Sequence, residues 1–146
     1  MSGNGGLRAS GRWHLQSTTR ISYTATALAE ALANSRYYNL PLRTALPRVL
    51  VSLMLRATRV LDLRDARCRR EVGISIDVIT GTDWRRDNQN GNEAVTQAWG
   101  AAFVAAGFEA AIVSSAAAPD GTNLVIFPEN LRASSEFFVE REVVIS

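Results

Sequence analysis

The sequence predicts a single α+β domain with mixed or antiparallel sheets and flanking helices. The chain has 146 residues and 47% of them are apolar, which is enough for one domain with a hydrophobic core. Strand-like stretches lie both before and after an Ala-rich helical region, so strands and helices do not alternate as they do in a doubly wound sheet. We see no internal repeat, and the expected domain spans residues 1–146.

The first third begins with a glycine-rich segment and continues into a strand and a helix. Residues 1–11 contain four of the ten glycines and few side chains to bury, so we expect this segment to be mobile. Residues 20–25, RISYTA, have the β-branched and aromatic content of a short strand. From Thr26 the apolar residues recur at spacings of three and four, which predicts a helix.

The middle of the chain predicts strands followed by a short helix. Residues 48–63 are rich in branched aliphatic side chains and indicate one long strand or two short ones, central in the sheet. Asp62 and Asp65 then lead into a helix that runs through Arg70, and Gly73 is its expected end.

The last part predicts a loop, a helix and three strands. Residues 80–92 are polar and rich in turn formers, so we assign a surface loop anchored by Trp84. Residues 93–107 form an apolar helix that Gly107 ends. The expected strands cover residues 108–115, 123–128 and 136–145.

Charge and cysteine content exclude several classes of protein. The chain has 16 basic residues, all of them Arg, and 14 acidic ones; the basic residues are scattered along the chain, which argues against direct nucleic-acid binding. Cys68 is the single cysteine, so neither an internal disulfide nor a zinc site is expected. No apolar run is long enough to span a membrane, and we expect a cytoplasmic protein.

Six polar residues at or near the ends of apolar elements are candidates for a functional site. They are Arg12, His14, Tyr23, Glu30, Ser115 and Asn123. Each also has a structural interpretation: a turn residue for Ser115 and Asn123, a solvent-facing helical residue for Glu30, a core aromatic for Tyr23. No nucleophile elbow and no glycine fingerprint for a dinucleotide is present, so the residues alone leave both interpretations open.

A series of motifs in order resembles the RES-domain family, which is named for its Arg, Glu and Ser. The resemblance runs from about Gly3 to Pro128. Its motifs are GRWH, YTA, TALAE, RVLDL, TQAWGAAFVAAGFEAAIV, SSA and GTNLVIFP. The order of these motifs is far more specific than any one of them.

The resemblance implies a fold like that of ADP-ribosyltransferases and chemistry on NAD without a metal. Members of the family cleave NAD by transferring ADP-ribose to phosphate or water, as toxins paired with an antitoxin that carries a DNA-binding helix-turn-helix. Two alternatives stay open: an ADP-ribosyltransferase that modifies a target protein, and a catalytically inactive RES-like binding module. A homo-oligomer is also left open.

The resemblance also assigns the site. By motif, Arg12, Glu30 and Ser115 are expected to be catalytic, with Ser114 where the family often has Pro. Contacts to NAD are expected from Arg12, Tyr23, Ser115 and Asn123. A carboxylate can stabilise an oxocarbenium-like transition state, a guanidinium can grip phosphate oxygens, and a tyrosine ring can stack on nicotinamide.

The assignment of the carboxylate has one alternative. Tyr23 and Glu30 are seven residues apart, which is closer than the family's usual spacing. A deletion in the connection explains this and keeps TALAE in register. Strict spacing would instead place Asn34 at the position of the acid, and the domain would then bind without turning over substrate.

Overall fold

The computed structural model describes residues 2–26 and 48–145. The described chain contains two sheets, four α-helices and two 3-10 helices. The strands are β1 (Ser22–Ala25), β2 (Arg48–Arg56), β3 (Val60–Asp62), β4 (Ala110–Ser114), β5 (Thr122–Ile126) and β6 (Glu136–Ile145). The helices are η1 (Asn4–Leu7), α2 (Ala66–Val72), α3 (Ile76–Gly81), α4 (Trp84–Gln89), α5 (Val95–Ala105) and η2 (Pro128–Asn130).

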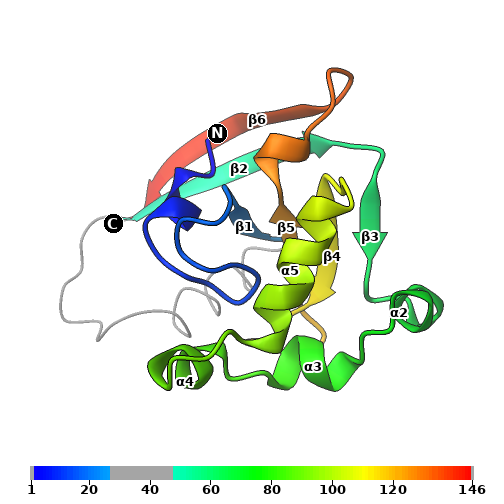
Figure 1. Ribbon diagram of the computed structural model, residues 1–146. Coiled ribbons are helices and arrows are strands. Elements are labelled where there is room, and N and C mark those ends of the chain that lie inside the picture. Colours follow the sequence, from blue (N-terminus) through cyan, green and yellow to red (C-terminus); the bar gives the residue numbers. More distant parts are fainter. Residues whose placement is uncertain (1, 27–47, 146) are drawn as a thin grey trace.

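The larger sheet is mixed and has the strand order β1-β5-β4-β3. β3 and β4 run parallel, whereas β5 is antiparallel to both β4 and β1. The carboxyl ends of β1, β3 and β4 therefore share one edge of the sheet with the amino end of β5. We refer to this edge as the carboxyl edge; α3 lies beside it at the bottom of Figure 1.

The hydrophobic core lies between one face of this sheet and α5, which crosses it (Figure 1). Phe103 of α5 is buried with Ala111 and Val113 of β4 and Val125 of β5. Trp13 completes the layer, with its ring 6.0 Å from that of Phe103. The α5 helix thus fixes the position of the residue 11–14 segment relative to the sheet.

The second sheet is a long antiparallel ribbon of β2 and β6 that arches over the top of Figure 1. The sequence predicts one long strand or two short ones within residues 48–63, and the structure has two, β2 and β3; the predicted central position is wrong. Among the described strands, β2 pairs with β6 alone and β3 lies at an edge of the larger sheet. The chain leaves one sheet for the other between Arg56 and Val60, where buried Glu109 binds the backbone N–H groups of Thr58 and Arg59.

The predicted loop at residues 80–92 is also wrong, because it contains α4. Asp83 caps this helix, and its carboxylate accepts a hydrogen bond from the N–H of Arg86. Asp and Asn favour turns because their side chains bind nearby backbone, and the same property makes them helix caps. The polar composition of this segment therefore did not distinguish a capped helix from a loop.

The other element predictions that fall on described residues agree with the structure; the helix predicted from Thr26 lies outside them, since residues 27–47 are not described. Asp65 caps α2, and Gly73 ends it with a φ of 88°. Gly107, just after α5, has a φ of 78°. In the glycine-rich start of the chain, the carbonyl oxygen of Gly3 accepts a hydrogen bond from the N–H of Ile21. This start packs beside β1, and its mobility stays a prediction.

Candidate functional site

An open cleft of about 590 Å³ lies at the carboxyl edge of the larger sheet. One wall is the turn from Ser114 to Thr122, which joins β4 to β5. The opposite side is formed by Ile76 and Thr80 of α3 and by Arg64, which follows β3. Elements that are distant in the sequence meet here because parallel β3 and β4 end at the same edge.

Ser115 orders the turn that forms this wall. Its hydroxyl oxygen accepts hydrogen bonds from the N–H groups of Ala117 and Ala118, at 3.1 and 3.2 Å. Its own N–H donates to the carbonyl oxygen of Gly121 at 2.9 Å. The side chain thus satisfies backbone donors that an apolar residue would leave unpaired, and it holds the cleft wall in one conformation.

Arg12 is buried, with 5% of its surface exposed, and its side chain reaches the carboxyl end of α3. Its Nη1 donates to the carbonyl oxygens of Ile79 and Thr82, at 3.2 and 2.9 Å. Its Nε–H is buried and has no hydrogen-bond partner in the part of the chain that the structure describes. Among the described residues, no carboxylate forms an ion pair with this guanidinium, and the carbonyl oxygens at the carboxyl end of α3 interact favourably with its charge.

Buried His14 forms a hydrogen-bonded pair with Tyr23. The Nε2 atom of His14 lies 2.8 Å from the carbonyl oxygen of Ala9, and Nδ1 lies 2.8 Å from the Tyr23 hydroxyl. A carbonyl only accepts, so Nε2 carries the proton and the Tyr23 hydroxyl donates to Nδ1 of the neutral ring. The same hydroxyl accepts from the N–H of Trp13 at 3.0 Å. The polar end of Tyr23 is anchored, while 44% of its surface stays exposed.

The sheet register places two of the predicted residues on one face. Tyr23 lies opposite Val125, and Asn123 lies opposite both Ala25 and Val113. Directly paired residues point to the same side of a sheet, and alternate residues along a strand do as well. Tyr23 and Asn123 therefore share the face that carries the core.

Not all predicted residues line the cleft. Ser114 and Ser115 do, whereas Arg12, His14, Tyr23 and Asn123 are absent from the part of its lining that the structure describes. Arg12 nevertheless donates a hydrogen bond to the backbone of α3, and Ile76 and Thr80 of this helix line the cleft. Glu30 and Asn34 lie outside the described residues.

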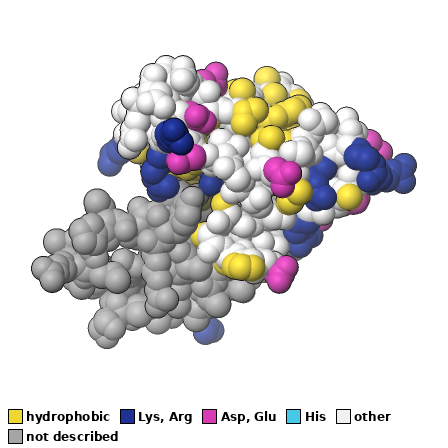
Figure 2. Space-filling view, turned by 90° about the horizontal axis from the view of Figure 1, so that it is seen from below, with side chains coloured by type: hydrophobic (Ala, Val, Ile, Leu, Met, Phe, Trp, Pro, Cys, Tyr) yellow, Lys and Arg dark blue, Asp and Glu magenta, His cyan; other side chains and the backbone are white. Residues whose placement is uncertain are grey.

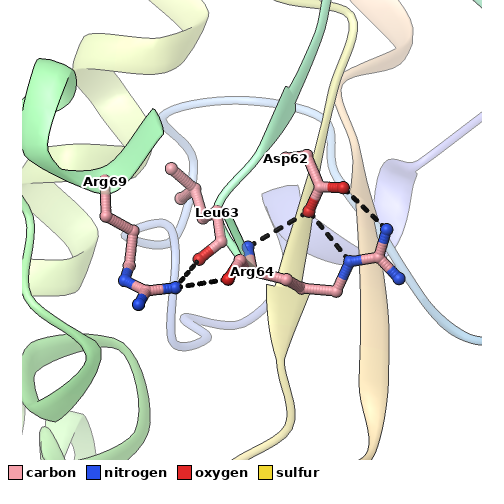
Figure 3. A network of polar contacts seen from close by, with 4 residues as sticks. All are labelled: Asp62, Leu63, Arg64 and Arg69. Carbon is pink, nitrogen blue, oxygen red and sulfur yellow. Dashed lines mark hydrogen bonds and ion pairs between the residues drawn. The ribbon is translucent and has the colours of Figure 1, made fainter. Parts of the chain in front are cut away.

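The sequence interpretation missed an arginine of the cleft that is paired with a carboxylate. Arg64 binds Asp62 through two parallel hydrogen bonds, Nε to Oδ1 at 2.8 Å and Nη2 to Oδ2 at 2.6 Å. Arg69 of α2 donates to the carbonyl oxygens of Leu63 and Arg64, at 2.8 and 2.6 Å (Figure 3). An acidic and a basic residue two positions apart at the end of a strand is the signal that could have indicated this pair.

The comparisons with known proteins agree with this architecture. A protein-family model described as the RES domain matches residues 1–143. The chain belongs to the RES-domain family. The resemblance in the motifs from GRWH to GTNLVIFP is thereby confirmed for this RES domain.

A solved structure supports the fold of this RES domain. A chain in the crystal structure of the M. tuberculosis MbcT–MbcA toxin–antitoxin complex superposes with a TM-score of 0.77 and 22% sequence identity. The match covers 100% of this chain and 77% of that chain. No curated protein matches the chain significantly. The likeness confirms the predicted α+β fold.

Two further properties of this RES domain concern metals and membranes. Within residues 2–26 and 48–145, no three His, Cys, Asp or Glu side chains cluster so that they could hold a metal ion. No helix in the same part of the chain is long and apolar enough to cross a membrane. Figure 2 shows the molecule from below. On the face seen there, basic side chains gather at the end of the molecule where α2 lies.

Proposed function

We propose that this RES domain breaks the bond between nicotinamide and ribose in NAD and transfers ADP-ribose to phosphate or water. The observation that carries the proposal is the open cleft of about 590 Å³ at the carboxyl edge of the sheet. Small-molecule sites have volumes of roughly 300–1,000 Å³. The family match over residues 1–143 supports NAD as the occupant of this cleft.

The proposed reaction needs placement and charge rather than a covalent nucleophile. The bond from C1′ to nitrogen breaks, and its electron pair goes to the pyridinium nitrogen, so nicotinamide leaves uncharged. An oxygen of phosphate or water forms the new bond at C1′, and a water acceptor also releases a proton. Positive charge develops on the ribose in the transition state, and a fixed carboxylate would stabilise it.

Five residues have proposed roles in this reaction. Glu30 supplies the carboxylate. Arg12, whose buried guanidinium donates to carbonyl oxygens at the carboxyl end of α3, attracts the anionic ligand. The exposed ring of Tyr23 offers a face for the nicotinamide, while its anchored hydroxyl holds the ring in place. Ser115 holds the turn that carries the cleft wall, and Asn123 contributes a further hydrogen bond to the ligand.

We also propose that the activity is toxic to the cell and that an antitoxin protein with a helix-turn-helix restrains it in the cytoplasm. Support comes from the matched structure, which is that of a toxin–antitoxin complex. A protein that covers the cleft would block access of NAD, which makes occlusion a sufficient mechanism of inhibition.

The first experiment measures release of nicotinamide from NAD by the purified chain, with and without inorganic phosphate. We expect release by the parent chain and a loss of about 100- to 1,000-fold in kcat for Glu30→Gln, since one electrostatic group is removed from the transition state. Asn34→Ala is the matched control and should keep parental activity. Equal losses of kcat in both variants would contradict the assignment of Glu30 as the catalytic carboxylate.

Two outcomes would contradict the proposal. Unchanged NAD after long incubation with the parent chain, with and without phosphate, indicates an inactive binding module. Transfer of label from NAD to a protein, with no free ADP-ribose product, indicates a protein ADP-ribosyltransferase. In cells, toxicity and loss of NAD should both disappear in Glu30→Gln.

A further inference from the structure

The cleft contains a charged side chain to which the motifs of the family assign no role. Among the described residues that line it, Arg64 and Asp120 are charged and the others are neutral. The Arg64 side chain is 48% exposed, so its unbonded donors are accessible to a ligand in the cleft. It differs in this respect from Arg12, which is buried and absent from the described lining.

The pairing with Asp62 uses only one edge of the Arg64 guanidinium. The two bonds to the carboxylate come from Nε and Nη2. Nη1 makes no hydrogen bond to any of the described residues, and the second N–H of Nη2 points to the same side as Nη1. These two N–H groups form the end edge of the guanidinium, whose spacing matches two oxygens of a phosphate group.

The backbone beneath this arginine is fixed from both sides. The N–H of Leu63 donates to the carbonyl oxygen of Ile112 in β4 at 2.8 Å, and the Leu63 side chain is fully buried. Arg69 holds the carbonyl oxygens of Leu63 and Arg64 (Figure 3). The N–H of Arg64 also binds Oδ1 of Asp62 at 3.1 Å. Arg64 is therefore oriented before any ligand arrives, and this lowers the entropic cost of binding.

The electrostatics keep both partners ionised. The hydrogen bonds from Arg64 lower the pKa of Asp62, and the hydrogen bond to Asp62 raises the pKa of Arg64. Across the cleft, Ser114 and Thr122 carry hydroxyl groups, which can donate further hydrogen bonds to phosphate oxygens. The described lining thus combines a fixed guanidinium edge and neutral donors with one carboxylate, that of Asp120.

We propose that the guanidinium of Arg64, oriented by Asp62, binds a phosphate group in the cleft. The inference rests on the proposed function, and the chemistry recognised is a phosphoryl oxyanion. Its source is either the pyrophosphate of the dinucleotide or the inorganic phosphate that accepts ADP-ribose. In the second case Arg64 would determine that phosphate, rather than water, is the acceptor.

Calorimetric titration of the full chain with ADP-ribose and, separately, with inorganic phosphate tests the proposal without turnover. We expect Arg64→Ala to weaken binding of one probe at least tenfold and Arg64→Lys to restore part of it. Asp62→Asn should weaken the same probe to a lesser degree, because Arg64 is then less well oriented. Arg67→Ala is the matched control, since Arg67 pairs with Glu71 on α2 and does not line the described cleft; it should match the parent within twofold.

The two probes distinguish the pyrophosphate of the dinucleotide from inorganic phosphate. Measurement of KM for NAD and for phosphate makes the same distinction independently. Loss of ADP-ribose binding with a raised KM for NAD indicates the pyrophosphate; loss of phosphate binding with a raised KM for phosphate indicates the acceptor. Binding of both probes by Arg64→Ala within twofold of the parent, or binding of neither by the parent, would overturn the proposal. If the parent binds a probe through Arg64 but consumes no NAD, the proposed reaction fails and the phosphate site stands.

Discussion

At the scale of single residues, the residue 11–14 segment is held by hydrogen bonds between side chains and backbone carbonyl oxygens. Gln97 of α5 donates from Nε2 to the carbonyl oxygens of Gly11 and His14, at 2.9 and 3.2 Å. Arg12 and His14 in turn bind backbone carbonyls. The segment therefore holds its geometry without a ligand, as the proposed electrostatic catalysis would require.

The pKa of His14 tests directly whether this segment is buried. Burial lowers its pKa below the ordinary value of 6.5 and outweighs the hydrogen bonds to backbone that raise it. His14 is the single histidine of the chain, so its ring protons can be followed by NMR without assignment. We expect a titration midpoint below 6.5, and a midpoint above 6.5 would contradict the described burial.

The sign of the effect on stability follows from the same shift. The unfolded chain takes up a proton on His14 near pH 6.5, whereas the folded chain does so at lower pH. The folded state therefore loses stability as the pH falls from about 6.5 toward the folded pKa. His14→Gln should remove this dependence in urea unfolding between pH 7 and pH 5, with Tyr23→Phe as a variant that keeps the histidine.

At the scale of elements, α5 packs against the segment before β1 more closely than a side chain would permit. A Cβ atom at Gly100 would lie 1.8 Å from the carbonyl oxygen of Trp13 and 2.7 Å from its carbonyl carbon. Backbone atoms cannot give way as the end of a side chain can. Gly100 thus allows the contact that positions Arg12 and His14.

Gly100→Ala should consequently destabilise the protein. We expect a loss of about 3 kcal/mol in the free energy of unfolding, because the steric cost exceeds the gain of about 1 kcal/mol from replacing a helical glycine. Gly81→Ala is the control, since nothing lies within 4 Å of a Cβ atom there, and it should be neutral or slightly stabilising. Equal melting temperatures for the two variants would show that the contact is not tight.

At the scale of the whole molecule, one buried carboxylate joins the two sheets. Oε1 of Glu109 accepts hydrogen bonds from the Thr58 hydroxyl and from the N–H groups of Thr58 and Arg59, between β2 and β3. Oε2 accepts from the N–H of Arg132 and the Ser135 hydroxyl, just before β6. Burial raises the pKa of Glu109, but these bonds outweigh it and lower the pKa from 4.5 to about 2.

Glu109→Gln should loosen the junction between the sheets. The amide would place N–H groups against N–H donors, and we expect a loss of roughly 2–4 kcal/mol in the free energy of unfolding at pH 7. Because the folded pKa is lowered, the stabilisation by Glu109 is present above pH 4.5 and disappears as the pH falls toward 2. The difference between parent and variant should therefore shrink over this range in urea unfolding, while exposed Glu93→Gln should match the parent at every pH.

The sequence by itself determined most of the elements and the family. Local signals were sufficient there: alternation in residues 136–145, Asp65 and Gly73 at the ends of α2, and the motifs from GRWH to GTNLVIFP. Each of these depends on residues close in the chain, whose preferences act within one turn or one strand.

Only the tertiary structure decided which residues meet. The cleft forms where α3, the end of β3 and the turn after β4 converge, and the pairing of β3 with β4 joins residues about 50 positions apart. Burial of Arg12 and the roles of Glu109 and Gly100 also arise from such contacts. Hydrophobic periodicity does not predict which distant element a polar side chain will face, because that depends on how the packed layers are arranged.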